Sequence, residues 1–459
     1  MTGGGVQTGS RRTNGVRADR TQTGAPQGDG TQEDGTQKDA SQAAWSQTDR
    51  SQTDQTQAGI QADGVRRREV RAAYFAFDRF PSSKGSAVHI GHMAAELFAC
   101  FDGGLLGVLG GGDLPRYQWE PDPGIEIARF AEQIPNLIDR AEAYSAWVGA
   151  HLEPHLATLR VCHVRDPWSA LPVVTAEGRR YAVVYEVNGL PSIELAHTWP
   201  RAAPATLSKI AELEDFCLER ADVVVVPSAV IAGAVRRRGV PDAKIELVPN
   251  GADVRAAPPR PDGAPGQYVV YVGALQPWQG LDVLLRAFAR LADLTGLRLV
   301  ICSSVPERRA RALRRLAERL GLADRIVWNF TLPHPDVAAW LAGAAVSVAP
   351  LTGCARNVDQ GCAPLKILES MAAGTPVVAS GLPAVRELLT DGVHGRLIAP
   401  DRPAELARAI RVLLEYPDAA RAMGERARQR VAEDFAWATT RAKMAAIYRS
   451  ITSNSRISN

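Results

Sequence analysis

The sequence has no long hydrophobic run and no cysteine framework. None of its apolar stretches reaches the roughly 18 residues that a membrane-spanning helix needs, and residues 1–20 lack the apolar core of a signal peptide. Its six cysteines are scattered without a C-x-x-C pair, which favours reduced thiols over disulfides. These absences predict a cytoplasmic protein.

No sign of charge predominates either. The chain has 53 Lys and Arg against 50 Asp and Glu, a net charge of +3, so we expect no nucleic-acid partner. Residues 1–65 contain no Leu, Phe or Tyr, and glutamine recurs every five residues from Gln22 to Gln57. Such a segment buries too little apolar area to offset the entropy of ordering. We predict that residues 1–65 form a disordered tail.

After the tail, short runs rich in Val and Ile alternate with helical patterns. The strand-like runs are residues 181–187, 222–226, 268–273, 297–302, 345–349 and 376–379. They are apolar on both faces, which is typical of parallel strands buried under helices. Repeated alternation of this kind predicts an α/β fold with doubly wound sheets.

A segment rich in Pro and Gly, residues 256–267, divides the folded part into two halves. We expect Rossmann-like domains over residues 66–252 and 253–435. Residues 436–459 would form a helix that packs back on the first domain, followed by a frayed end. Because ligands of open α/β sheets bind beyond the carboxyl ends of the strands, the cleft between the two sheets is the expected site.

The usual cofactor motifs are missing. No G-x-G-x-x-G or Walker motif is present, and we interpret the glycine cluster at 103–112 as a flexible loop between elements. The folded region has no D-x-D, and no third ligand accompanies the pair His151 and His155. We therefore expect neither a resident cofactor nor a metal ion.

The most informative stretch is residues 361–378. Pro364 suits the first turn of a helix, where the N–H groups of Leu365 and Lys366 would be free. Together with the helix dipole and the charge of Lys366, they would form a diphosphate site. Glu369 lies on the same face and could accept hydrogen bonds from ribose hydroxyls. An ordinary amphipathic helix with a surface Lys–Glu pair is the alternative.

Two other segments of the sequence favour the diphosphate site over an ordinary amphipathic helix. Gly273 closes a strand, and Gln279 and Gly280 precede the next helix. Arg356 and Asn357 fall in a polar loop after the strand at 345–349. Three strand-end elements with this chemistry predict a nucleotide-sugar site in the second half.

These motifs resemble those of the retaining glycosyltransferases of the GT-B fold, in family 4, which includes sucrose- and mannosyl-transferring enzymes. The similarity covers nearly all of residues 70–450 and is carried by residues 80–89, 185–189, 221–228, 248–253, 271–280 and 364–369. It implies two facing Rossmann-like domains. It also implies metal-independent, retaining transfer of a hexose-type sugar from a nucleotide diphosphate sugar, which serves as co-substrate, to an acceptor hydroxyl.

On the first domain, the resemblance places Gly85 and His89 on the acceptor side, and Asn188 at a strand end that touches the donor sugar. Glu186 could act as a base, contact a sugar hydroxyl, or be a buried carboxylate that fixes a loop. Arg165 could contact an anionic acceptor or form a salt bridge. On the second domain, the donor-binding set is Gly273, Gln279, Gly280, Asn357, Pro364, Leu365 and Glu369.

The sequence departs from the family at the diphosphate clamp. The family commonly has Arg and Lys where this chain has Ala274 and Gln279, and one of its paired glutamates is replaced by Gly361. We hypothesise that Arg356 and Lys366 supply the missing charge and, with Glu186, form the catalytic set.

Two other functions stay open, a GT-B-like sugar-nucleotide epimerase and a non-catalytic regulatory protein that binds nucleotide sugars. Sugars, lipid-linked sugars and small molecules are all candidate acceptors, and the oligomeric state is open. An arginine-rich helix at 306–320 could contact the inner membrane face peripherally, although a solvated face is favoured.

Overall fold

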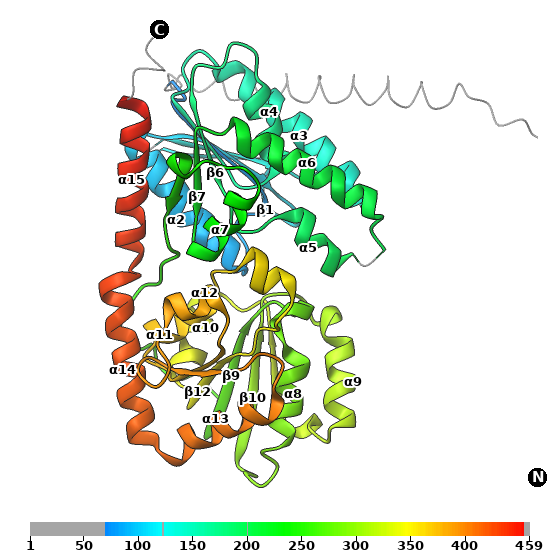
Figure 1. Ribbon diagram of the computed structural model, residues 1–459, viewed down its shortest axis with the longest axis vertical. Helices are drawn as coiled ribbons and strands as arrows, with labels where there is room; N and C mark the ends of the chain where they lie inside the picture. The colour runs from blue at the N-terminus through cyan, green and yellow to red at the C-terminus, as the bar shows by residue number, and fades with distance from the viewer. Residues whose placement is uncertain (1–68, 122–123, 200, 454–459) are drawn as a thin grey trace, which may run out of the picture. The chain divides into compact units, whose positions relative to one another are not determined.

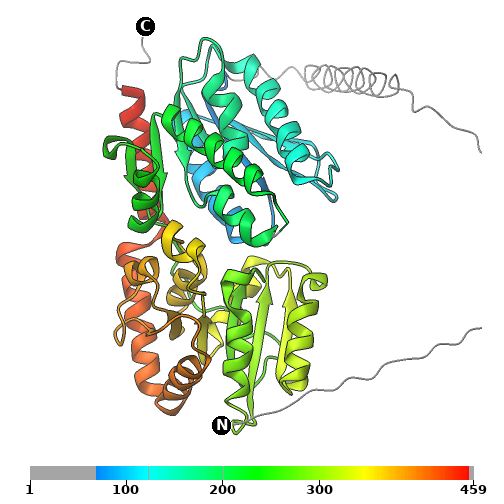
Figure 2. The same ribbon diagram turned by 45° about the vertical axis from the view of Figure 1, so that its right-hand side comes forward.

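The computed structural model describes residues 69–121, 124–199 and 201–453. The predicted disordered tail and the predicted frayed end after residue 453 lie outside them. Two largely parallel sheets follow one another along the chain, each covered by helices (Figures 1 and 2). The predicted α/β fold with two doubly wound sheets is confirmed.

The first sheet has the strand order β3-β4-β2-β1-β5-β6-β7-β8, with only β3 antiparallel to its neighbour. Its strands are β1 Ala72–Arg79, β2 Gly104–Leu109, β3 Tyr117–Glu120, β4 Ile125–Phe130, β5 Val161–Val164, β6 Ala182–Glu186, β7 Val223–Val226 and β8 Ile245–Leu247. Its helices are α2 Gly85–Phe101, α3 Leu137–Leu152, α4 Pro167–Thr175, α5 Pro191–Thr198, α6 Pro204–Arg220 and α7 Ala229–Arg237.

The second sheet has the order β11-β10-β9-β12-β13-β14. Its strands are β9 Gln267–Gly273, β10 Leu297–Ser303, β11 Ile326–Phe330, β12 Val346–Ala349, β13 Val377–Ser380 and β14 Arg396–Ile398. Its helices are α8 Leu281–Ala289, α9 Arg311–Arg319, α10 His334–Ala342, α11 Leu365–Ala372, α12 Pro383–Leu388, α13 Pro403–Glu415 and α14 Pro417–Asp434.

Strand β9 shows why the Val-rich runs become central strands. Val269 and Tyr271 pack on the side of α8, whereas Tyr268 and Val270 pack on the side of α10. Because successive side chains point to opposite faces, a strand that is covered on both sides must be apolar throughout. The carboxyl ends of these strands are therefore held rigidly.

The glycine cluster at 103–112 corrects the sequence interpretation. We interpreted it as a flexible loop, but Gly104–Leu109 is strand β2, paired with β1 and β4. A Cβ at Gly107 would collide with the ring of Phe75, so glycine allows this ring to pack directly on the strand. The absence of side chains thus serves close packing and not mobility.

The C-terminal helix α15, Trp437–Ser453, packs against α2 of the first sheet, whereas α14 packs against α11 of the second. Figure 1 shows the two helices following one another past both sheets. Tyr448 is fully buried on α15, and its hydroxyl lies 2.7 Å from Nδ1 of His163. The last helix therefore connects the second half of the chain to the first.

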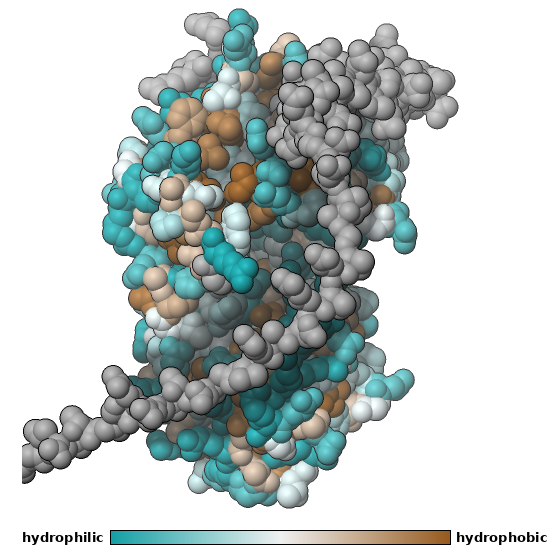
Figure 3. All heavy atoms as spheres, turned by 90° about the vertical axis from the view of Figure 1, so that its right-hand side faces the viewer, coloured by the Kyte–Doolittle hydropathy of each residue, from teal (hydrophilic) through white to brown (hydrophobic). Residues whose placement is uncertain are grey.

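Helix α9 is shorter than the predicted arginine-rich helix at 306–320. Leu313 and Leu316 pack toward the core, and Arg314 covers the ring of Trp328 at 5.6 Å. Figure 3 shows that hydrophilic side chains dominate the lower part of this side of the molecule. Within the described ranges, no helix combines the length and the apolarity that crossing a membrane requires.

Candidate functional site

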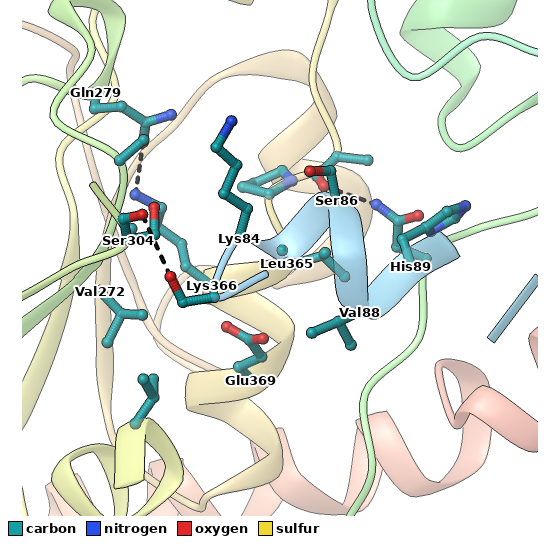
Figure 4. Close-up of a pocket in the computed structure, with 18 of the residues that line it drawn as sticks. Lys84, Ser86, Val88, His89, Val272, Gln279, Ser304, Leu365, Lys366 and Glu369 are labelled. Carbon is teal, nitrogen blue, oxygen red and sulfur yellow. Dashed lines mark hydrogen bonds between the residues drawn. The ribbon is translucent and has the colours of Figure 1, made fainter. Parts of the chain in front are cut away.

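A cavity of about 340 Å³ lies where the carboxyl ends of both sheets meet. The start of α2, Arg165 after β5 and Asn188 after β6 line it from the first sheet, and β9, β10, α10 and α11 line it from the second (Figure 4). Eleven predicted site residues line it: Gly85, His89, Arg165, Asn188, Gly273, Gln279, Arg356, Pro364, Leu365, Lys366 and Glu369. The structure thus brings together residues that are almost 300 positions apart in the sequence.

Lys366 is the central cation on the second side of the cavity. Its Nζ donates to the Oε1 of Gln279 at 2.6 Å (Figure 4) and to the hydroxyl of Tyr271 at 2.9 Å, and both acceptors are neutral. A Cβ at Gly273 would lie 2.7 Å from this nitrogen, so the glycine makes room for it. Desolvation by burial lowers the pKa of Lys366 to about 7. An anion in the cavity would relieve that cost.

Glu369 lies one turn further along α11 and is paired with His334 at the start of α10. The Nε2 of His334 lies 3.2 Å from the Oε1 of Glu369. The hydrogen bond to Glu369 raises the pKa of His334. The histidine is half exposed, so the pair lies at an edge of the cavity where a ligand hydroxyl could reach the carboxylate.

Arg356 is less available than predicted. The expected loop is a π-helical turn, Arg356–Gln360, and the guanidinium binds Glu194 of α5 with its Nη2 at 2.7 Å and its Nε at 3.1 Å. It also lies 5.1 Å above the ring of Trp278. Since Glu194 already offsets its charge, Arg356 bridges the two sheets and is a weaker diphosphate clamp than we hypothesised.

Glu186 does not line the cavity but lies buried behind it. One carboxylate oxygen contacts His89 and Asn188. The other lies 3.1 Å from Nε2 of His163 and 3.6 Å from Nε of Arg165. Burial by itself would raise the pKa of Glu186, yet the neighbouring His89 and Arg165 hold it well below its usual range.

A carboxylate with so low a pKa is a poor general base near neutral pH. The geometry therefore favours the interpretation of Glu186 as a buried carboxylate that fixes its neighbours. Two of these neighbours, His89 and Arg165, do line the cavity. The Nδ1 of His89 is buried and has no hydrogen-bond partner among the described residues, so it can receive one from a ligand.

Two other predicted donor-site residues have structural positions. Asn357 is fully buried, and its amide donates to the carbonyl oxygens of Trp278 and Thr352 at 2.9 and 2.8 Å. Gly280, the residue just before α8, has φ +71, and a Cβ there would collide with the carbonyl of Pro350. Both residues shape the loops behind the cavity and do not line it.

Sequence reasoning missed several lining residues, among them Lys84, Ser86, Asn250, Ser304 and His334. None lies in a cofactor motif, and each enters the site only through the contact between the two halves. The available signal was that Lys84 and Asn250 fall in the segments 80–89 and 248–253, which carry the family resemblance.

A second, larger cavity of about 640 Å³ lies on the other side of His334 and Glu369. It is lined by the segment 251–258, by residues of α10 and α11, and by Trp437. The ring of Trp437 stacks on that of His92 at 4.1 Å. Within the part of the chain that the structure describes, no cluster of three or more His, Cys, Asp or Glu side chains could hold a metal ion.

Comparison with known families assigns both halves. Residues 84–251 match the model of the glycosyl transferase 4-like domain, and residues 266–416 match that of the glycosyl transferases group 1. This chain belongs to the group 1 glycosyltransferases. The predicted family is therefore confirmed.

Relatives agree with this family. The chain is 28% identical over 286 residues to the D-inositol 3-phosphate glycosyltransferase of Thermobispora bispora, a match that covers 57% of this chain and 65% of that protein. It is 26% identical over 350 residues to the MMP alpha-(1->4)-mannosyltransferase of Mycolicibacterium hassiacum, covering 72% and 82% of the two chains. The match thus spans somewhat less than two thirds of the first relative's length.

Solved structures share the fold. Sucrose-phosphate synthase from Thermosynechococcus elongatus superposes with a TM-score of 0.68 at 18% identity, covering 83% of this chain and 98% of that one. HepE of Anabaena in complex with UDP-glucose superposes with a TM-score of 0.64 at 18% identity, covering 83% and 99%. At such identities the likeness shows the fold alone.

Proposed function

We propose that the protein transfers a hexose-type sugar from a nucleotide diphosphate sugar to an acceptor hydroxyl, with retention of configuration and without a metal ion. The observation that carries this proposal is the start of α11, where Leu365 and Lys366 line a cavity between two sheets. Among the solved relatives, HepE binds UDP-glucose and UDP. This supports a nucleotide-sugar donor, while the base and the sugar are open.

The start of α11 is suited to stabilise a leaving nucleoside diphosphate. Its first amides have no partner within the helix, and the positive end of the helix dipole adds to the charge of Lys366. The bond between the anomeric carbon and the diphosphate oxygen breaks while the acceptor oxygen bonds to the same carbon. Charge that develops on the diphosphate is met by groups that are already in place, which is the largest catalytic term in many enzymes.

The acceptor hydroxyl must lose its proton in the same step. Retention places the acceptor on the face from which the diphosphate departs, so a phosphate oxygen there can take up this proton. On this scheme no carboxylate base is needed, in agreement with the low pKa of Glu186. His89 would orient the sugar or acceptor through its unpartnered Nδ1, while Glu186 holds the ring from behind.

Glu369 would bind the ribose hydroxyls, for which its pairing with the half-exposed His334 leaves it accessible. The acceptor is a sugar, a lipid-linked sugar or a small molecule. The epimerase and regulatory alternatives are not favoured, because the matching families and relatives are glycosyltransferases. Cytoplasmic location and peripheral membrane contact through the arginines around α9 stay predictions.

The test is incubation of the full chain with a panel of radiolabelled UDP- and GDP-hexoses and candidate acceptors. Release of free nucleotide diphosphate together with a labelled acceptor, whose anomeric configuration equals that of the donor, is the expected result. An inverted product would reject the retaining mechanism. An altered donor sugar would indicate epimerisation, and binding without any turnover would indicate a regulatory protein. Full activity in the presence of EDTA is expected.

A further inference from the structure

Few of the cations that line the cavity are left without a carboxylate partner and so able to neutralise a diphosphate. A nucleoside diphosphate carries more than one negative charge near neutral pH, and the family's two clamp positions are Ala274 and Gln279 here. Glu194 offsets the charge of Arg356 and Glu186 that of Arg165. Of the two cations that line the cavity from the second sheet, Lys366 is then the one that, among the described residues, has no carboxylate partner and can meet an incoming anion.

Lys84 is a further cation at the cavity, and it comes from the first sheet. It is the residue immediately before α2, with an extended backbone of φ −84 and ψ 147, and it lines the same cavity as Lys366. Figure 4 shows its side chain extending into the space between Gln279 and Ser86. Within the described ranges, its ammonium forms no ion pair and no hydrogen bond.

Contacts on both sides fix the backbone of Lys84 against the second sheet. The hydroxyl of Ser83 lies 3.5 Å from the carbonyl oxygen of Ser304, just after β10. On the other side, a Cβ built at Gly85 would lie 3.1 Å from Cδ1 of Leu365, so the starts of α2 and α11 are in direct contact. Lys84 therefore extends from a point between the end of β10 and the start of α11.

We propose that Lys84 contacts the diphosphate of the donor and replaces the missing clamp from the opposite side of the cleft. This inference rests on the proposed function. In the family pattern both clamp cations belong to the second domain, whereas here one of them would belong to the first. Charge neutralisation of the leaving group then depends on both halves being in contact around the donor.

The first test compares binding of uridine, UMP and UDP, and of the guanosine series, to the full-length protein and to Lys84→Met. We expect the variant to bind the diphosphate about 10- to 100-fold more weakly, since charge-assisted contacts to phosphate are strong, while binding of the nucleoside changes less than about twofold. Equal weakening across the series would show that Lys84 only supports the loop and would overturn the proposal. So would unchanged diphosphate binding.

The matched control is Lys209→Met, which removes an exposed lysine on α6 that lines neither cavity. It should bind the whole series as the unmodified protein does. Lys84→Arg keeps the charge and should retain most of the diphosphate affinity. If Lys84→Met were poorly folded by thermal unfolding, Lys84→Gln would provide the same comparison with a polar side chain of similar length.

The second test is rescue. Introducing Gln279→Lys into Lys84→Met returns a cation to the position where the family has it, so turnover with the active donor should recover at least about tenfold. If a double variant that still binds the nucleoside showed no recovery of turnover, this would contradict the proposal that Lys84 takes the place of the family's clamp residue.

The failures of the two proposals are distinguishable. If the unmodified protein binds neither UDP nor GDP and turns over no nucleotide sugar, the proposed function fails and this inference with it. If the unmodified protein turns over donor and Lys84→Met does so equally well, the inference about Lys84 alone fails.

Discussion

Two ionisable groups of opposite charge lie on opposite sides of the cleft, Glu186 buried and Lys366 partly buried, and their surroundings differ. Glu186 is enclosed by His89, His163 and Arg165. The electrostatic attraction of His89 and Arg165 and the hydrogen bonds of the two histidines hold its pKa well below the usual range. Among the described residues, Lys366 has only the neutral acceptors Gln279 and Tyr271 at hydrogen-bond distance, and desolvation lowers its pKa to about 7.

This difference distinguishes a residue that supports the structure of the site from a residue that takes part in the reaction. A buried charge that is fully compensated stabilises the fold, because its removal leaves the partner charges buried without a counter-charge, which is unfavourable. A buried charge that is poorly compensated destabilises the protein by itself and gains stability when a counter-ion arrives. By this argument Glu186 holds other residues of the site in position, whereas Lys366 is the group that binds an anion.

The largest expected effect comes from Lys366→Met. Removing the cation beside the leaving group should lower kcat by about 10³-fold, while thermal unfolding should show equal or greater stability, because an unfavourable buried charge is gone. Steady-state release of nucleotide diphosphate and a melting curve measure the two effects. If Lys366→Met kept its activity, or became clearly less stable, the contrast drawn here between Lys366 and Glu186 would be wrong.

Glu186→Gln should produce the opposite combination. The amide keeps the shape but leaves Asp78 as the remaining carboxylate beside Arg165 and removes the one that His89 and His163 contact, so the free energy of unfolding should fall by about 3 kcal/mol. Chemical denaturation measures this loss. Diphosphate affinity should change little in protein that is still folded, since Glu186 does not line the cavity. A stable Glu186→Gln protein with weakened diphosphate binding would instead place Glu186 in the donor site.

Diphosphate binding should depend on pH through Lys366. Free Lys366 loses its proton as pH rises through about 7, and a bound diphosphate favours the charged form. Affinity for UDP or GDP should therefore fall between pH 7 and 9, by up to about tenfold per pH unit, with uptake of about one proton at pH 8. Calorimetry in two buffers of different ionisation enthalpy measures this uptake. In Lys366→Met both the slope and the uptake should vanish.

The smallest effect is expected at the edge of the cavity. His334→Ala removes an ion pair in which the histidine is half exposed, and such pairs contribute less than about 1 kcal/mol. The KM for the donor should change less than about fivefold and kcat hardly at all. Because pairing raises the pKa of His334, any difference from the unmodified protein should be largest at low pH, where the pair is charged. A large fall in kcat would assign His334 to the chemistry.

Much of the fold could be predicted because its central strands are apolar on both faces. The runs at 268–273 and 297–302 became β9 and β10 with bounds within one residue. Strand β2 was missed because its glycines have no side chains that could show a pattern. There the information lies in the residues that pack on it, such as Phe75.

The site residues could be predicted where they lie together at the start of one helix, but not where they come from segments far apart in the chain. Lys366 and Glu369 share α11, so their spacing alone placed them on one face. Lys84 and His334 gave no such signal, because each faces the cavity only through contacts with residues far away in the chain. The same limit explains Arg356, whose partner Glu194 is 162 positions away.

The most direct test of the account is a crystal structure of the full chain with UDP or GDP bound. We predict that the terminal phosphate lies within hydrogen-bond distance of Nζ of Lys366 and of the amides that begin α11. A diphosphate found in the larger cavity beside Trp437, with Lys366 still bound only to Gln279 and Tyr271, would contradict it.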